Sequence, residues 1–204
     1  MPTTVRKRVI RIGPDDNGRA MSLADFDRAI AAPGYLYELG EGAVEVSEIP
    51  NLEHGRVVEF LRDLVAIYKH ENPGIIDYSS GGSDSKVLIE LNESERHPDL
   101  SIYCKAPPQL KQPWDLWVPE IVVEVVSESS RKRDYDVKPA EYLAFGVKEY
   151  WIIDPVKKIL VVNIRVGGRF DVKVLKASQK HQTHILPGLK IDVRKLLRAA
   201  TGAK

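Results

Sequence analysis

Cysteine is almost absent from this sequence. Cys104 is the single cysteine among 204 residues, so the chain can form no internal disulfide and no cysteine metal cluster. A protein without disulfides suits a reducing compartment. The composition therefore predicts a cytoplasmic location.

Long apolar runs and an excess of one charge are also missing. No stretch has the length of a transmembrane helix, and the chain does not start like a signal peptide. The 30 Lys and Arg residues nearly balance the 29 Asp and Glu residues, for a net charge of +1, so no overall field attracts the protein to nucleic acid or to a membrane. We expect a soluble protein without membrane contacts, in which any DNA contact comes from a local basic patch.

The sequence does contain the pattern of one globular domain with mixed secondary structure. Hydrophobic residues make up 43% and charged residues 29%, which is ordinary for a folded domain. Residues 51–70 have apolar side chains at helical spacing, and residues 35–49 and 158–175 have the pattern of hairpins. We expect an α/β fold, a central mixed β-sheet flanked by helices with additional β-hairpins. Residues 1–20 would form an N-terminal arm or edge strand, and residues 21–200 the domain.

One carboxylate stands in the most apolar strand that the sequence predicts. The stretch from Pro119 to Ser130 is PEIVVEVVSESS, and its continuous apolar run indicates a strand buried on both faces, which is typical of the centre of a sheet. Glu124 interrupts that run. Because a buried, unpaired charge costs several kcal/mol, we expect Glu124 to be protonated, paired with a cation or bound to a metal.

A second carboxylate marks the start of a neighbouring predicted strand. Asp99 follows Pro98 in HPDLSIY, and aspartate is a poor strand former, so a specific requirement places it at the strand mouth. Two carboxylates on neighbouring strands can bind a hard cation such as Mg²⁺, which prefers oxygen ligands and keeps waters for substrate phosphates. The pair is a candidate nuclease centre. The alternatives are a turn residue at Asp99 and an ion-paired or edge-strand acid at Glu124.

A lysine follows the Glu124 strand. In RDYDVKPAEYLAFG, Pro139 is tolerated only in the first turn of a helix, so the pattern predicts a helix over residues 136–145 with Lys138 at its N-terminal end. Lys138 shares one side of this helix with Tyr142 and Phe145, the side expected to face the sheet. Its ammonium can then reach the carboxylates. The alternative is a solvated surface lysine.

The ordered set of these residues resembles the Uma-type restriction endonuclease family of the PD-(D/E)xK, restriction-endonuclease-like superfamily. The similarity rests on Pro98-Asp99, on VVEVVSESS around Glu124, and on the series D…K…Y…GVKEYWIIDP that follows. It extends from LYELGEGAVEVS through HGRVVEFLRDLV to LPGLKIDV and so covers most of the chain. The resemblance implies a nuclease core in which Asp99 and Glu124 bind a divalent metal, Mg²⁺ or Mn²⁺, and a lysine assists the attacking water.

The position of that lysine departs from the usual superfamily motif. Val126 stands two residues after Glu124, where the motif has its lysine, whereas the Uma-type pattern has a lysine on the next helix, matched by Lys138. Glu38 and His54 also match the family pattern. His54 could bind metal, orient a carboxylate or shuttle a proton, and a structural role is the alternative. Glu38 could be an extra catalytic acid or the partner of a hairpin salt bridge.

A basic segment lies between the Glu124 strand and the Lys138 helix. Arg131, Lys132 and Arg133 follow one another there. Such a cluster can neutralise the phosphates of a nucleic acid substrate, and the alternative is a solvated loop.

We therefore expect a metal-dependent endonuclease that hydrolyses phosphodiester bonds of DNA, and the sequence leaves a homodimer open. The rival is a catalytically inactive module with a nuclease fold that binds nucleic acid or a protein partner. Val126 and the near-zero net charge favour the rival, whereas Asp99, Glu124 and Lys138 favour the enzyme. A hydrolase of other phosphodiesters is a third alternative.

Overall fold

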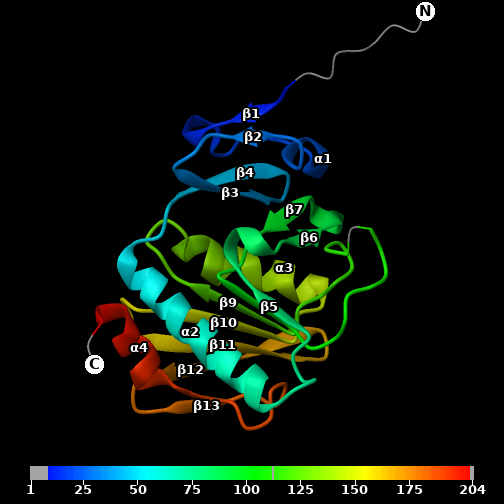
Figure 1. Ribbon diagram of the computed structural model, residues 1–204. Helices are drawn as coiled ribbons and strands as arrows, with labels where there is room; N and C mark the ends of the chain where they lie inside the picture. The colour runs from blue at the N-terminus through cyan, green and yellow to red at the C-terminus, as the bar shows by residue number, and fades with distance from the viewer. Residues whose placement is uncertain (1–8, 112, 203–204) are drawn as a thin grey trace, which may run out of the picture. The chain divides into compact units, whose positions relative to one another are not determined.

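The computed structural model describes residues 9–111 and 113–202 (Figure 1). Residues 1–8, the first part of the predicted N-terminal arm, lie outside the described residues. None of the described helices combines the length and the apolar character that crossing a membrane requires.

The chain divides into two compact units. Residues 1–49 and 88–96 belong to the first unit, and residues 50–87 and 97–204 to the second. The candidate residues Asp99, Glu124, Lys138 and His54 all belong to the second unit, so its construction decides how they are placed. Glu38 belongs to the first unit.

The first unit is built around a β-hairpin. Strands β3 (Tyr35–Gly40) and β4 (Ala43–Glu48) pair antiparallel, and the two turn residues between them both have positive φ angles. This confirms the hairpin predicted for residues 35–49. Strands β7 (Ser94–Arg96) and β6 (Val87–Ile89) extend the sheet in the order β4-β3-β7-β6. The smaller elements are β1 (Arg11–Ile12), η1 (Pro14–Asp16), α1 (Leu23–Phe26), β2 (Ile30–Ala31) and η3 (Glu90–Asn92).

The second unit contains a mixed sheet. Its strand order is β12-β11-β10-β9-β8-β5, with β9 parallel to β10 and antiparallel to β8. This confirms the predicted mixed sheet and places the Glu124 strand in its interior. The strands are β5 (Tyr78–Ser80), β8 (Leu100–Tyr103), β9 (Ile121–Val125), β10 (Glu149–Asp154), β11 (Ile159–Val166) and β12 (Arg169–Lys176), and a separate pair is formed by β13 (Lys180–Gln182) and β14 (Lys190–Asp192).

Helices cover both faces of this sheet (Figure 1). Helices α2 (Leu52–Glu71) and α4 (Val193–Thr201) share a hydrophobic core with one face. Helix α3 (Lys138–Phe145) packs on the other face, where the rings of Tyr142 and Tyr150 meet edge to face at 4.9 Å. The long helix predicted for residues 51–70 is thus confirmed.

The alternation of side chains along β9 assigns each residue to one of these faces. Ile121, Val123 and Val125 belong to the core shared with α2 and α4. Val122 and Glu124 therefore point to the opposite face, toward α3. All residues of β9 are buried, as the continuous apolar run predicts.

A π-helical turn, η4 (Arg133–Val137), leads into α3. Helical structure already begins at residue 131, whereas the proline pattern predicts a start near residue 136. The π-helical turn explains the difference. A proline ring inside an ordinary α-helix collides with the carbonyl four residues earlier, and the wider turn ahead of Pro139 avoids this collision.

The missing N–H of Pro139 also affects hydrogen bonding. With the five-residue spacing of the π-helical turn, the N–H of residue 139 would bond to the carbonyl of Asp134, but proline has none to give. The buried hydroxyl of Tyr150, on β10, donates to the Asp134 carbonyl instead, at 3.0 Å. This bond ties the start of α3 to the sheet.

Replacing Tyr150 by Phe tests how much the hydrogen bond to the Asp134 carbonyl contributes to stability. We expect the free energy of unfolding to fall by about 1–3 kcal/mol, because a buried carbonyl loses its donor. Urea denaturation measures the change. Tyr35→Phe, at an exposed position, serves as the control and should leave stability nearly unchanged. Equal stabilities of the two variants would contradict the proposed role.

Candidate active site

Glu124 is paired with a cation in a region shielded from water. The Lys138 ammonium donates to Glu124 Oε1 at 2.8 Å, and the Tyr142 hydroxyl donates to the same oxygen at 2.8 Å. The side chains of Glu124 and Lys138 are only 6% and 4% exposed. Of the three states expected for Glu124, the structure shows the ion pair, which offsets the cost of burying a lone carboxylate.

Asp134 is a third acid in this region, and it is not among the site residues predicted from the sequence. Its Oδ1 lies 3.4 Å from Lys138 Nζ, and its Oδ2 accepts a hydrogen bond from the Ser130 hydroxyl at 2.6 Å. Ser127 and Ser130 each donate their N–H to the other's Oγ, at 3.0 and 3.1 Å, in the manner of a capping box. The four-residue spacing from Asp134 to Lys138 is the signal that could have found this acid.

Asp99 lies where β8 begins and β9 ends. Its Oδ2 accepts a hydrogen bond from the Val125 N–H at 2.7 Å and lies 3.0 Å from His54 Nε2. The antiparallel register of β8 with β9 puts Asp99 one position before the pairing starts, opposite Glu124. Asp99 is the more accessible of the two acids, because 20% of its side chain is exposed.

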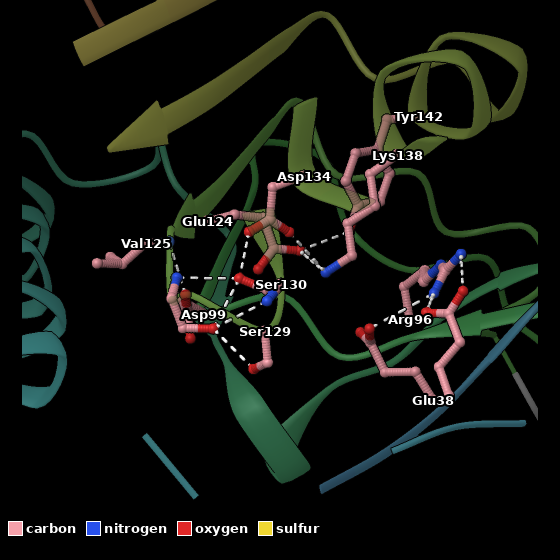
Figure 2. A network of polar contacts seen from close by, with 12 residues as sticks. Glu38, Arg96, Asp99, Glu124, Val125, Ser129, Ser130, Asp134, Lys138 and Tyr142 are labelled. Atoms are coloured by element: carbon pink, nitrogen blue, oxygen red, sulfur yellow. Dashed lines mark hydrogen bonds and ion pairs between the residues drawn. The ribbon is translucent and has the colours of Figure 1, made fainter. Parts of the chain in front are cut away.

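The structure thus places four predicted residues in two pairs, in each of which an acid near the end of a strand contacts a basic side chain from a helix. Asp99 binds His54, and Glu124 binds Lys138. Figure 2 shows Asp99, Glu124, Asp134 and Lys138 within one network of polar contacts. Their catalytic roles remain predictions.

Glu38 has a partner within the first unit. Arg96 Nη1 donates to Glu38 Oε2 at 3.5 Å, and the fully buried Arg96 also pairs with Glu45. Glu45 is the residue opposite Glu38 in the β3–β4 hairpin, so two carboxylates flank one guanidinium. This is the kind of salt bridge that the structural alternative predicts, and a catalytic role of Glu38 stays a prediction.

The basic segment is only partly exposed. The Arg131 guanidinium pairs with Asp154 at the end of β10, whereas Lys132 is exposed and Arg133 is half-buried. Burial alone would raise the pKa of Asp154, but the Lys157 N–H and the Arg131 guanidinium hold this pKa below its ordinary value. Lys132 is therefore the residue of the three that is best placed for an external phosphate, and substrate binding by the segment stays a prediction.

The donor set suits a hard cation. Asp99 and Glu124 offer carboxylate oxygens from adjacent strands, and among the described residues no group of three or more His, Cys, Asp or Glu is arranged to hold a metal ion. Waters and a substrate phosphate would have to complete the coordination, which is the usual way that proteins bind Mg²⁺. Zn²⁺, which takes three or four protein ligands rich in nitrogen and sulfur, fits this pair poorly.

A mixed sheet with helices on both faces is the architecture expected for a restriction-endonuclease-like fold. A solved structure described as "a putative nuclease belonging to DUF820", from Anabaena variabilis, shares this fold with a TM-score of 0.71. The two sequences are 14% identical, and the match covers 88% of this chain and 99% of the other.

The family follows from the sequence match. The model of the Uma2 family, described as "Putative restriction endonuclease", matches residues 23–194. The chain belongs to this family, which confirms the resemblance to Uma-type endonucleases and supports a nuclease. No curated protein matches the chain.

The contact between His54 and Asp99 should be visible in the titration of His54. Burial lowers the pKa of His54, but the hydrogen bond to Asp99 and the charges of Asp99 and Asp134 raise it by more, so the net shift is upward. We expect Asp99→Asn to lower the pKa of His54, as measured by NMR titration of the metal-free protein. An unchanged pKa would contradict this account.

The same contact makes stability depend on pH. Because the folded pKa of His54 lies above the unfolded value of about 6.5, the contact stabilises the protein fully below that value. The stabilisation is lost as the pH rises through the folded pKa. In Asp99→Asn this pH dependence should be weaker, as measured by urea denaturation at several pH values.

Removing the buried cation should be costly. In Lys138→Met, Glu124 stays buried without its ammonium partner, and we expect the free energy of unfolding to fall by about 3–5 kcal/mol. Adding Glu124→Gln should recover part of this loss, because the charge then leaves together with its partner. Urea denaturation of the single and the double variant measures both changes in the free energy of unfolding.

The matched control is Lys148→Met. In the wild type the Lys148 ammonium lies 3.5 Å from Glu120 Oε1, but the lysine side chain is 51% exposed. The expected loss in the free energy of unfolding is therefore below about 1 kcal/mol. A loss in Lys138→Met that is no larger than the loss in the control would show that the buried pair is not required for stability.

Proposed function

We propose that the protein is an endonuclease that hydrolyses phosphodiester bonds of DNA with the help of Mg²⁺ or Mn²⁺. The observation that carries the proposal is the position of Asp99 opposite Glu124 on adjacent strands, with Glu124 held by Lys138. The family description, which names restriction endonucleases, supports DNA as the substrate, since restriction enzymes cut DNA.

The contacts of the residues support a role for each. Asp99 and Glu124 would hold the metal, which when bound supplies an activated water and neutralises charge on the phosphodiester. His54 holds Asp99 Oδ2 in place together with the Val125 N–H. A fixed orientation of the carboxylate matters because ligand geometry decides metal affinity.

Lys138 acts through Glu124. Its side chain is 4% exposed and its ammonium is bound to Glu124 Oε1, so it holds the carboxylate in position. We therefore assign Lys138 as a positioning residue, while Lys132 on the preceding segment would contact a substrate phosphate.

A catalytically inactive nuclease-fold module that binds nucleic acid is the second candidate. The observation in its favour is that Lys138 and Tyr142 both donate to Glu124 Oε1. A carboxylate already neutralised in this way is a weaker ligand for a cation. Metal binding and cleavage therefore have to be measured separately.

Nicking of supercoiled plasmid DNA tests the proposal. We expect cleavage with Mg²⁺ or Mn²⁺ and none with EDTA. Asp99→Asn or Glu124→Gln should lower the rate by more than about 100-fold, because loss of a residue that merely supports a metal ligand already costs about 10–100-fold. Asp171→Asn on the β11–β12 hairpin, a substitution of the same type at an exposed carboxylate, should cleave like the wild type.

Calorimetric titration with Mg²⁺ separates the two candidates. Wild type should bind the metal and Asp99→Ala should not. Wild type that binds metal but cleaves neither DNA nor RNA would favour the inactive module, and wild type that neither binds metal nor cleaves would overturn the proposal.

A further inference from the structure

A groove lies along the edge of the sheet in the second unit, beside α2. Its volume is about 580 Å³. It borders β5, which is the last strand in the sheet order. Neither Glu124 nor Lys138 lines it. Its lining includes Arg62, Tyr78, Ser79, Ser80, Asp84 and Leu100.

The groove starts next to Asp99. A Cβ atom at Gly81 would lie 1.9 Å from the Asp99 carbonyl oxygen, so only glycine permits this approach of the two backbones. The Gly82 N–H donates to the Pro98 carbonyl at 2.8 Å. Leu100, the residue after Asp99, lines the groove itself. The groove therefore ends one residue along the backbone from Asp99.

Arg62 supplies a positive charge to the groove. Its Nη2 donates to the Gly81 carbonyl at 3.2 Å, which holds the guanidinium against the strand edge. A guanidinium has five N–H donors, so this bond leaves further donors for an anion. Among the described residues Arg62 forms no ion pair.

Hydroxyl groups and an aromatic ring complete the groove. Ser79 and Ser80 line it, and the buried Ser80 Oγ has no hydrogen-bond partner within the described part of the chain. The Tyr78 ring stacks on Trp117 at 5.5 Å, and its hydroxyl donates to the Asp84 carbonyl at 3.3 Å. Arginine and serine side chains are typical phosphate contacts in nucleic acid complexes.

We propose that this groove binds the sugar–phosphate backbone of one nucleic acid strand, with Arg62 on a phosphate. The inference rests on the proposed function, in which Asp99 lies at the phosphate that is cut. Arg62 follows His54 by eight residues of α2, which is about 12 Å along the helix. That length corresponds to about three or four nucleotides of one strand along B-DNA. Arg62 therefore contacts the strand away from the cut and sets its position.

The groove also contains an acid, which sharpens the test. Asp84 belongs to the lining, and a carboxylate there repels phosphates. Removing the positive charge at Arg62 and removing the negative charge at Asp84 should therefore change DNA affinity in opposite directions. A nonspecific effect of net charge can be recognised with Arg169→Ala, because Arg169 is an exposed arginine of the β11–β12 hairpin.

Fluorescence anisotropy with a labelled DNA oligonucleotide in EDTA measures affinity without cleavage. For Arg62→Ala we expect the Kd to rise roughly tenfold or more and the slope of log Kd against log salt to fall by about 0.7–0.9. Arg62→Lys should keep most of the slope, Asp84→Asn should bind more tightly, and Arg169→Ala should match the wild type. Circular dichroism verifies that each variant is folded.

Cleavage kinetics with Mg²⁺ give the second readout. Arg62→Ala should raise KM and leave kcat nearly unchanged, because a contact away from the cut affects binding and not the chemical step. If Arg62→Ala has the same Kd, salt slope and KM as the wild type, the inference is wrong. It is also wrong if Arg62→Ala loses no more DNA affinity than Arg169→Ala does.

The two proposals fail in different ways. If wild type cleaves no DNA but Arg62→Ala still weakens binding selectively, the proposed catalytic function fails and the groove stands. If wild type cleaves DNA and Arg62→Ala binds and cleaves DNA like the wild type, the proposed role of the groove is wrong and the catalytic proposal stands. If the wild type binds no DNA in the anisotropy assay, the proposed role of the groove is wrong.

Discussion

The carboxylate of Glu124 lies inside a central strand and needs a partner for its charge. The position of α3 and the connection that leads to it from β9 provide this partner. Glu124 points from β9 toward α3, where a lone charge would cost several kcal/mol. Lys138, the first residue of α3, provides the cation, and Tyr142, one turn later, donates to the same oxygen. Helix α3 must therefore start close to the end of β9. The serine cap at Ser127 and the π-helical turn after it make this short connection.

The two carboxylates of the candidate centre have different surroundings although they lie on adjacent strands. Glu124 is buried and held from the α3 side, whereas Asp99 is partly exposed and held by His54 from the α2 side. The strand ends are the place where side chains from both faces of the sheet can meet. One acid is thus shielded from water, and the other remains partly accessible.

Several elements could be predicted because their signals are local. The hairpin of β3 and β4, the long helix α2 and the buried strand β9 follow from periodicity and turn residues, and the structure confirms them. The start of the helix around Lys138 was predicted too late, since a π-helical turn lets helical structure precede Pro139. Asp134 was missed because its burial depends on that turn.

The sequence by itself determined that Glu124 would be buried and would need a partner, because a run of β-branched residues and the cost of desolvating a charge are both properties of the chain alone. It also determined the family, since the family match over residues 23–194 is a match of sequence. Only the tertiary structure decided which partner each acid has. Lys138 stands 14 residues from Glu124 and His54 stands 45 residues from Asp99. Contacts at such separations depend on strand order, register and the start of α3, which local periodicity does not encode.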